Sequence, residues 1–280
     1  MTSDLIFDLG MNNGDDTDFY LAKGFRVVAV EANPDLCAAA MQRFSREISS
    51  GRLRIVNKAI SESEDEIELF INEDVTGWST IRPEWVKTRR QAGTRSRSVS
   101  VPATTFHRVL REFGVPYYLK ADIQGAELLC LEALLHFEDR PKFISISAGT
   151  DALATGAMRH TRRGLELFSQ LGYRDFKIVP QRGMEHQKCP FPAREGRYID
   201  YGFCHGSSGP FGEELPGEWV DAERALREHR KIVMSYRLAG NSRSSAGWFK
   251  KLPSGTIRRC LDRLFWRGTD WYDTHARLGR

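Results

Sequence analysis

The sequence lacks any uninterrupted apolar run that approaches the roughly 20 residues needed to span a bilayer. Its first residues pass directly into a strand-like segment, so we expect no secretory signal. Cysteine is scarce and the five cysteines are widely scattered, which favours reduced thiols over a disulfide framework. There is no repeat of fixed period and no low-complexity tract. With 41% hydrophobic and 28% charged residues, these absences predict a soluble, cytoplasmic globular protein.

Histidine and cysteine also show no metal-binding pattern. The nearest approach to one is the set His186, Cys189, Cys204 and His205. Its spacing matches no zinc finger, and adjacent Cys204 and His205 would be awkward as joint ligands. We therefore predict no metal site.

The net charge of +4 is unevenly distributed along the chain. Residues 221–280 hold 14 Lys and Arg against six Asp and Glu. A smaller basic cluster comprises Lys87, Arg89, Arg90, Arg95 and Arg97. Such clusters either attract phosphates, anionic sugars or acidic lipid headgroups, or are solvated surface. No recognised binding motif accompanies the charge, so we expect no nucleic-acid partner.

The C-terminal region carries an amphipathic stripe. Apolar residues recur at helical spacing at Ile257, Cys260, Leu261, Leu264 and Phe265, with aromatic residues on either side. Residues 221–280 could thus contact an anionic membrane surface, or pack on their own domain or on a second subunit in a homo-oligomer.

Short apolar runs alternate with amphipathic stretches, which predicts βα units around a mostly parallel, seven-stranded sheet. The expected strands are residues 5–9, 26–30, 53–56, 117–121, 142–146, 175–179 and 198–204. The last two have no long helix between them, so we expect an antiparallel strand at one sheet edge. Residues 67–71 predict an extra edge strand, and residues 72–100 an excursion from the α/β pattern. Residues 209–280 predict a helical extension or cap.

A glycine turn joins the first strand to the first helix. It reads Asp8-Leu9-Gly10-Met11-Asn12-Asn13-Gly14, and Glu31 ends the second strand. Glycine at such a turn permits positive φ or close approach of a ligand, and an acid at that strand end can bind both hydroxyls of a ribose. The pattern therefore predicts a nucleoside-containing cofactor. Asn12 occupies the second glycine position of the dinucleotide fingerprint, which counts against the alternative of an NAD-dependent oxidoreductase.

The Gly-x-x-x-Gly spacing is similar to the first motif of class I S-adenosylmethionine-dependent methyltransferases. Three further segments resemble the FkbM-type family within them: Val30-Glu31-Ala32-Asn33-Pro34, Asn57-Lys58-Ala59-Ile60-Ser61, and Leu119-Lys120-Ala121-Asp122-Ile123-Gln124-Gly125-Ala126-Glu127. The resemblance covers roughly residues 5–205. It implies a Rossmann-like methyltransferase domain over residues 1–208, S-adenosyl-L-methionine as cofactor, and O-methylation of a saccharide or other hydroxylated metabolite, including an anionic one.

Turn and resemblance together give the cofactor-binding candidates Asp8, Gly10, Asn12, Gly14, Thr17, Glu31, Ala32, Asn33, Lys58, Ala59 and Asp122. An alcohol is a poor nucleophile, so methyl transfer to it needs a base. Asp122 is the first candidate, with a helix N-cap as its alternative role. His160 and Glu127 are further catalytic candidates, which could instead be a surface residue and a first-turn acid.

Two positions depart from the family pattern. Gln124 stands where the family usually has glutamate, and Ser147 ends the fifth strand where an acid is common. Glutamine cannot serve as a base. These departures leave a non-enzymatic alternative: a degenerate methyltransferase fold that binds a membrane or polyanion through its basic C-terminal region.

Overall fold

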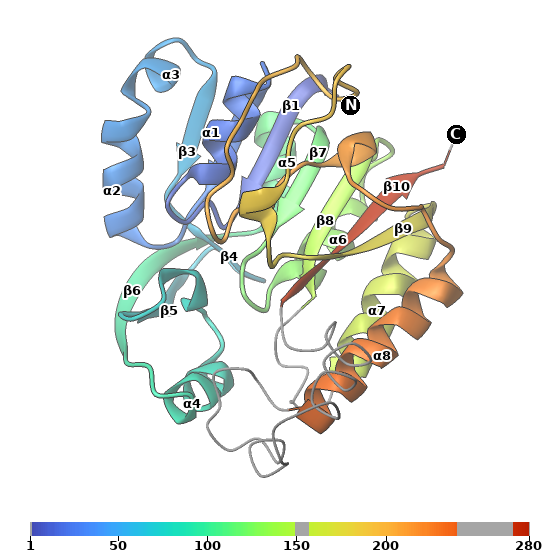
Figure 1. Cartoon of the computed structure of the whole chain (residues 1–280). Coiled ribbons are helices and arrows are strands. Elements are labelled where there is room, and N and C mark those ends of the chain that lie inside the picture. Colours follow the sequence, from blue (N-terminus) through green and yellow to red (C-terminus); the bar gives the residue numbers. More distant parts are fainter. Residues whose placement is uncertain (1, 149–156, 240–270, 280) are drawn as a thin grey trace.

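The computed structural model describes residues 2–148, 157–239 and 271–279, and a seven-stranded sheet forms its centre (Figure 1). The strand order is β3-β2-β1-β7-β8-β10-β9. The strands are β1 (Thr2–Leu9), β2 (Arg26–Val30), β3 (Leu53–Val56), β7 (Pro116–Ala121), β8 (Phe143–Ala148), β9 (Tyr173–Pro180) and β10 (Tyr272–Leu278). The pairs from β3 to β8 are parallel, and β10 is antiparallel to both of its neighbours. The predicted fold class, a mostly parallel α/β sheet, is confirmed.

Helices cover both faces of the sheet, because the strands of a parallel sheet carry apolar side chains on both sides. One face, which includes Phe7 and Leu9, packs against α5 (Phe106–Phe113), α6 (Glu127–Leu134), α7 (Ala157–Gln170) and α8 (Ala222–Ala239). The opposite face packs against α1 (Asp15–Ala22) and α2 (Pro34–Arg43), and the short α3 (Ser45–Ser49) follows them. The connection between β9 and α8 covers the remainder of this second face, where Phe211 stacks on Tyr118 at a centroid distance of 4.4 Å.

The closing strand predicted at residues 198–204 does not form; these residues belong to the irregular connection between β9 and α8. Their aromatic side chains pack on α1 instead. The rings of Tyr201 and Phe203 lie 5.1 and 4.9 Å from the ring of Phe19. The alternation that suggests a strand therefore reflects packing against a helix.

The antiparallel strand comes from the C-terminal region and is not the edge strand. β10 lies between β8 and β9, so that Thr274 is opposite both Ile146 and Ile178. The prediction that residues 209–280 are a helical extension is therefore incomplete: they include α8, but residues 272–278 form β10 and complete the main sheet. The segment Tyr-Asp-Thr-His-Ala-Arg-Leu is too polar to be recognised as an interior strand from its own sequence.

The predicted amphipathic stripe from Ile257 to Phe265 lies outside the described residues. Among the helices that the structure describes, none is long and apolar enough to cross a membrane.

The predicted excursion forms a small second sheet of order β4-β6-β5. Its strands are β4 (Ala59–Ile60), β5 (Glu66–Asn72) and β6 (Ser96–Thr104), and the 3-10 helix η1 (Thr76–Trp78) and α4 (Pro83–Gln91) lie between β5 and β6. Leu69, Ile71 and Val101 give it a core of its own. The extra strand predicted at residues 67–71 is therefore β5, which pairs with β6 and not with an edge of the main sheet.

Candidate active site

The turn after β1 brings its backbone against the end of β7. Gly10 has φ +81°, a conformation that side chains disfavour. A Cβ on Gly10 would lie 2.0 Å from the carbonyl oxygen of Asp122, so the two segments can approach this closely only at glycine. Gly14 has φ +84° and directly precedes α1. A Cβ on Gly14 would meet the ring of Phe44, so this glycine permits close packing against Phe44 and does not face the edge of the sheet.

Glu31, at the end of β2, holds two loops in place. Its Oε2 accepts a hydrogen bond of 2.8 Å from the backbone N–H of Asn12, and its Oε1 accepts one of 2.8 Å from the N–H of Asn33. The Asn57 amide donates to the carbonyl oxygen of Glu31 at 2.9 Å. Burial raises the pKa of Glu31. Each carboxylate oxygen can accept a second hydrogen bond, so Glu31 keeps acceptor capacity for a ligand.

A cleft opens at this carboxyl edge, between the main sheet and the excursion. It is lined by seven of the predicted cofactor-binding residues: Gly10, Asn12, Glu31, Ala32, Lys58, Ala59 and Asp122. The excursion forms the opposite wall with Thr76, Gly77, Ser79, Thr80 and Ile81. Leu36, Ile60 and Ile123 add apolar surface. The cleft thus combines an acidic group, backbone turns and an apolar wall.

A chain of hydrogen bonds links Asp122 to the excursion. Gln124 donates from Nε2 to Asp122 Oδ1 at 2.7 Å and accepts at Oε1 from Arg89 of α4 at 2.7 Å. Thr80 Oγ1 donates to the backbone carbonyl of Gln124 at 2.8 Å. Gln124 has a positive φ of 53°, and these contacts on both sides hold it there. The glutamine that departs from the family pattern therefore orients the Asp122 carboxylate.

The predicted basic cluster is not a uniform anionic-ligand surface. Arg89 is buried in the contacts with Gln124, Arg95 pairs with Asp74 at 3.4 Å, and Arg97 pairs with Asp35 at 2.6 Å. Three of its five cations thus bind groups of the protein itself.

The amino-acid sequence matches the family model of the methyltransferase FkbM domain over residues 8–174, which is more than half of the chain. The chain belongs to the FkbM methyltransferase family. No curated protein is significantly similar to it in sequence.

Solved structures with this fold are distant from the chain. A methyltransferase FkbM from Methylobacillus flagellatus is 15% identical with a TM-score of 0.39, over 63% of this chain and 39% of that protein. This chain therefore spans well under half the length of that relative. A SAM-dependent methyltransferase from Archaeoglobus fulgidus is 11% identical with a TM-score of 0.37, over 98% of this chain and 85% of the other. The C-terminal domain of a precorrin-6Y C5,15-methyltransferase from Rhodobacter capsulatus is 12% identical, with a TM-score of 0.36 and coverage of 71% and 77%.

Membership of the FkbM family implies S-adenosylmethionine as cofactor, and the residues of the cleft fit it. The molecule has a ribose diol, an adenine ring and a charged amino-acid end. Glu31 offers acceptors for the diol and Leu36 and Ile123 an apolar wall for the ring. Asn12 Oδ1 is buried and has no hydrogen-bond donor within the described part of the chain, so it can accept from an ammonium group.

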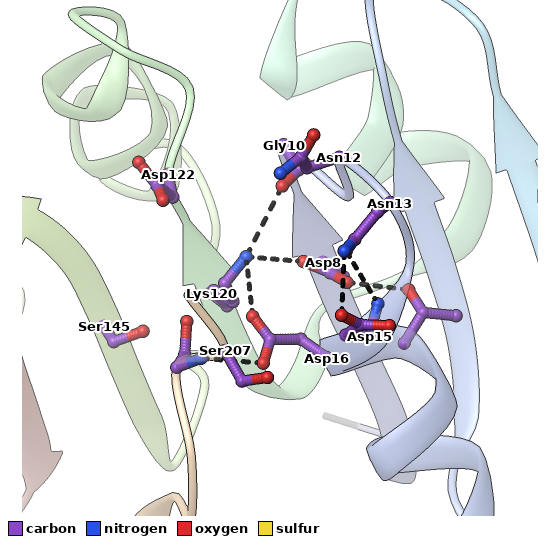
Figure 2. Close-up of polar contacts among 12 residues, drawn as sticks. Asp8, Gly10, Asn12, Asn13, Asp15, Asp16, Lys120, Asp122, Ser145 and Ser207 are labelled. Carbon is purple, nitrogen blue, oxygen red and sulfur yellow. Dashed lines mark hydrogen bonds and ion pairs between the residues drawn. The ribbon is translucent and has the colours of Figure 1, made fainter. Parts of the chain in front are cut away.

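Two predicted cofactor-binding residues lie beneath the cleft rather than in its wall. Asp8 accepts hydrogen bonds from Thr17 Oγ1 at 2.7 Å and from Lys120 Nζ at 2.9 Å, and Asp16 lies 3.3 Å from the same ammonium (Figure 2). Lys120 also donates to the carbonyl oxygen of Gly10 at 3.4 Å. Asp8 and Thr17 are fully buried and do not line the cleft, so the structure gives them the role of supporting the Gly10 turn.

Asn33 has a similar supporting place. Its Oδ1 caps α2 by accepting from the N–H of Asp35 at 3.0 Å, while its own N–H donates to Glu31.

The remaining catalytic candidates lie apart from one another. Glu127 is buried at the start of α6 and accepts from the N–H of Gly125 at 3.0 Å; burial and the charge of Asp122 raise its pKa to about 7. His160 on α7 lines a small separate cavity with His229 and Thr274 and does not line the cleft. Burial, with the charge of Arg82, lowers the pKa of His160.

Sequence reasoning missed several residues of the site. The excursion residues of the cleft wall, the buried Arg89 and the Asp16 carboxylate beneath the cleft are not among the candidates. Asp16 is adjacent to the glycine turn and could have been found there. Asp273 is buried on β10 opposite Ser147 and has no local signal in the sequence, because its place depends on the position of β10 in the sheet.

Proposed function

We propose that this protein is an S-adenosylmethionine-dependent O-methyltransferase that acts on a hydroxyl of a saccharide or other hydroxylated metabolite. The observation that carries the proposal is that Glu31 and Asp122 line one cleft, on either side of Gly10. The first is the acid suited to a ribose diol, and the second is a carboxylate at the end of the central strand β7.

The residues of the cleft have two roles: some bind the cofactor, and Asp122 acts on the acceptor hydroxyl. Glu31 would hold the ribose, the Gly10–Asn12 turn would hold the amino-acid end, and Leu36 and Ile123 would contact the adenine. When bound, S-adenosylmethionine supplies an electrophilic methyl group on a sulfonium. Asp122, oriented by Gln124, accepts a hydrogen bond from the acceptor hydroxyl and orients its O–H bond for deprotonation. Fixed orientation of the two reactants contributes much of the rate enhancement in such a transfer.

The first test is calorimetric titration with S-adenosylhomocysteine, with NAD as a competing ligand. We expect micromolar binding that Glu31→Ala weakens and that NAD does not displace. No binding by the folded protein would overturn the proposal.

The second test is an acceptor screen for transfer of a labelled methyl group, beginning with sugars. On any acceptor found, Asp122→Asn should lower turnover by at least about 100-fold, since a carboxylate that orients the acceptor hydroxyl and assists its deprotonation contributes that much or more. It should change the affinity for S-adenosylhomocysteine by less than about threefold. Binding of the cofactor without turnover on any acceptor would favour the non-enzymatic alternative, in which the basic C-terminal region binds a membrane or polyanion.

A further inference from the structure

A row of buried polar side chains crosses the sheet just below the cleft. Lys120 on β7 is opposite Ser145 on β8, and Ser145 is opposite His275 on β10. All three are buried. Because side chains alternate along a strand, the residues two positions further along each strand project from the same face.

That next row consists of Asp122, Ser147 and Asp273. Ser147 is opposite Asp273 in the register, and Asp122 continues β7 by donating its N–H to the carbonyl oxygen of Leu9 at 2.9 Å. Figure 2 shows Asp122 beyond Lys120, just past the end of β7. An acid is therefore present on each side of the short Ser147 side chain, one from β7 and one from β10.

One strand, β8, lies between these two acids. Neighbouring strands lie about 4.8 Å apart, so the backbones of Asp122 and Asp273, two strands apart, are separated by roughly 10 Å. Ser147 has the smallest hydroxyl side chain, so the residue between the two carboxylates is short and uncharged. The family commonly has an acid at the position of Ser147, and here the adjacent strand β10 provides an acid, Asp273, opposite that position.

Asp273 is buried among charges that do not neutralise it. It lies in the field of Lys120 of β7, Asp122 directly after β7, Glu127 of α6 and Asp16 of α1. Ser147 and Val179, beside it on β8 and β9, do not ionise. The Lys120 ammonium is already engaged by Asp8 at 2.9 Å and Asp16 at 3.3 Å. Burial and the nearby Asp122 raise the pKa of Asp273 well above its ordinary value. A carboxyl group with a raised pKa is a better proton acceptor near neutral pH than one with an ordinary pKa.

An unpartnered amide lies on the same face, one step further out. The N–H of Gln181 donates to the carbonyl oxygen of Trp271 at 3.0 Å and so continues the pairing of β9 with β10. Gln181 therefore projects from the same face as Val179, the residue opposite Asp273. Its amide is buried, and neither the nitrogen nor the oxygen has a partner within the part of the chain that the structure describes. A buried amide in this state is ready to bind a polar ligand.

We propose that Asp273 is a second catalytic carboxylate, which together with Asp122 flanks the acceptor hydroxyl above Ser147 and takes up its proton. Asp122 accepts the orienting hydrogen bond. The O–H bond of the acceptor then breaks, its oxygen bonds to the methyl carbon, the electron pair of the carbon–sulfur bond stays on sulfur, and the proton resides on an Asp273 oxygen. The inference rests on the proposed function.

The arrangement also defines the acceptor. Two carboxylates repel an anion, whereas hydroxyl groups donate to carboxylates, and the Gln181 amide can bind a further hydroxyl. The acceptor class is therefore an uncharged, polyhydroxylated molecule rather than an anionic sugar.

The test uses proton linkage and needs no acceptor. The full chain is titrated with S-adenosylmethionine and with S-adenosylhomocysteine, near neutral pH, in buffers of different ionisation enthalpy. The sulfonium charge lowers the proton affinity of a nearby carboxyl, so the first ligand should release more protons than the second. We expect Asp273→Asn to remove at least about half of this difference, and Glu166→Gln, an exposed control on α7, to leave it unchanged.

The outcomes separate this inference from the proposed function. The role of Asp273 is overturned if the two ligands differ in proton release by the same amount in wild type and in Asp273→Asn, or if they do not differ in wild type. Cofactor binding stands in either case. No binding of either ligand overturns both. Should Asp273→Asn fail to fold, Ser147→Asp adds a third carboxylate at the same level and should enlarge the difference; an unchanged value overturns the inference.

Discussion

The ammonium of Lys120 lies 2.9 Å from the carboxylate of Asp8, and both side chains are almost completely buried. The two residues are directly opposite each other on β7 and β1, the central strands of the sheet. Lys120 also contacts Asp16 and the carbonyl oxygen of Gly10. One lysine thus connects two strands, the first helix and the glycine turn directly beneath the cleft.

Replacing Lys120 by methionine should destabilise the protein strongly. The change leaves the carboxylates of Asp8 and Asp16 buried without their cation, and removal of one partner from a buried ion pair typically costs about 3–5 kcal/mol. Urea unfolding at pH 7 measures the loss, with the exposed Lys87→Met as control. A loss within about 1 kcal/mol of the control would contradict a structural role for the pair.

Substitutions of Glu31 should weaken cofactor binding in a graded way. Glu31→Gln keeps one acceptor oxygen but loses the other, so one of the hydrogen bonds from Asn12 and Asn33 is lost. Glu31→Ala loses both. We expect a loss of affinity for S-adenosylhomocysteine of about tenfold for the first, or about 1.4 kcal/mol, and a larger loss for the second. Calorimetry measures both, with the exposed Glu68→Gln as control; equal affinities throughout would argue against ribose binding by Glu31.

Arg89→Met should loosen the outer wall of the cleft. Arg89 joins α4 to Gln124, and through it to Asp122. Without this contact, the amides of residues 76–91 should exchange hydrogen faster, while those of β1 and β7 stay protected. Hydrogen exchange followed by mass spectrometry compares the variant with Arg90→Met, whose side chain is exposed on the same helix. The same exchange pattern in both variants would show that the chain of hydrogen bonds does not hold the wall.

The pH dependence of stability should change in Glu127→Gln. Burial raises the pKa of Glu127 to about 7 in the folded protein, from 4.5 when unperturbed. The stability that its protonated form contributes is complete below about pH 4.5 and is lost as the pH rises through 7. Glutamine carries no such charge, so the variant should gain stability over wild type by up to about 3 kcal/mol at pH 8, and much less at pH 5.

Urea unfolding at several pH values tests this expectation, with the exposed Glu138→Gln as control. A difference between Glu127→Gln and wild type that does not vary with pH would contradict a raised pKa at this position.

Truncation after Asp270 should abolish the native fold. The cut removes β10, which pairs with β8 and β9 and fills the space between them. Residues 271–280 therefore cannot be deleted to test membrane or polyanion binding without loss of the sheet. The native circular dichroism spectrum and cooperative unfolding should both be lost, whereas removal of residues 279–280 alone should have little effect on either. A truncated chain that unfolds cooperatively at near wild-type urea concentrations would refute this role of β10.

The sequence by itself determined the parts of the molecule whose signals are local. Apolar runs located six strands of the main sheet, from β1 to β9, because each run is a continuous stretch that requires burial. Gly10 and Glu31 marked the cofactor edge, since a positive φ at a strand end and an acid at the next strand end are properties of short segments.

Only the tertiary structure decided which of those residues face the cleft and which support it. Asp8 belongs to the same motif as Gly10, and Thr17 follows that motif on α1, yet their side chains point into the protein, toward Lys120 and toward each other. Likewise, the polarity of Asp273 suggested no strand, and it lies opposite Ser147, more than 100 residues earlier in the chain, because β10 enters the sheet beside β8. Periodicity reports on neighbours within a segment, whereas the pairing of distant strands depends on how the whole set of buried surfaces packs together.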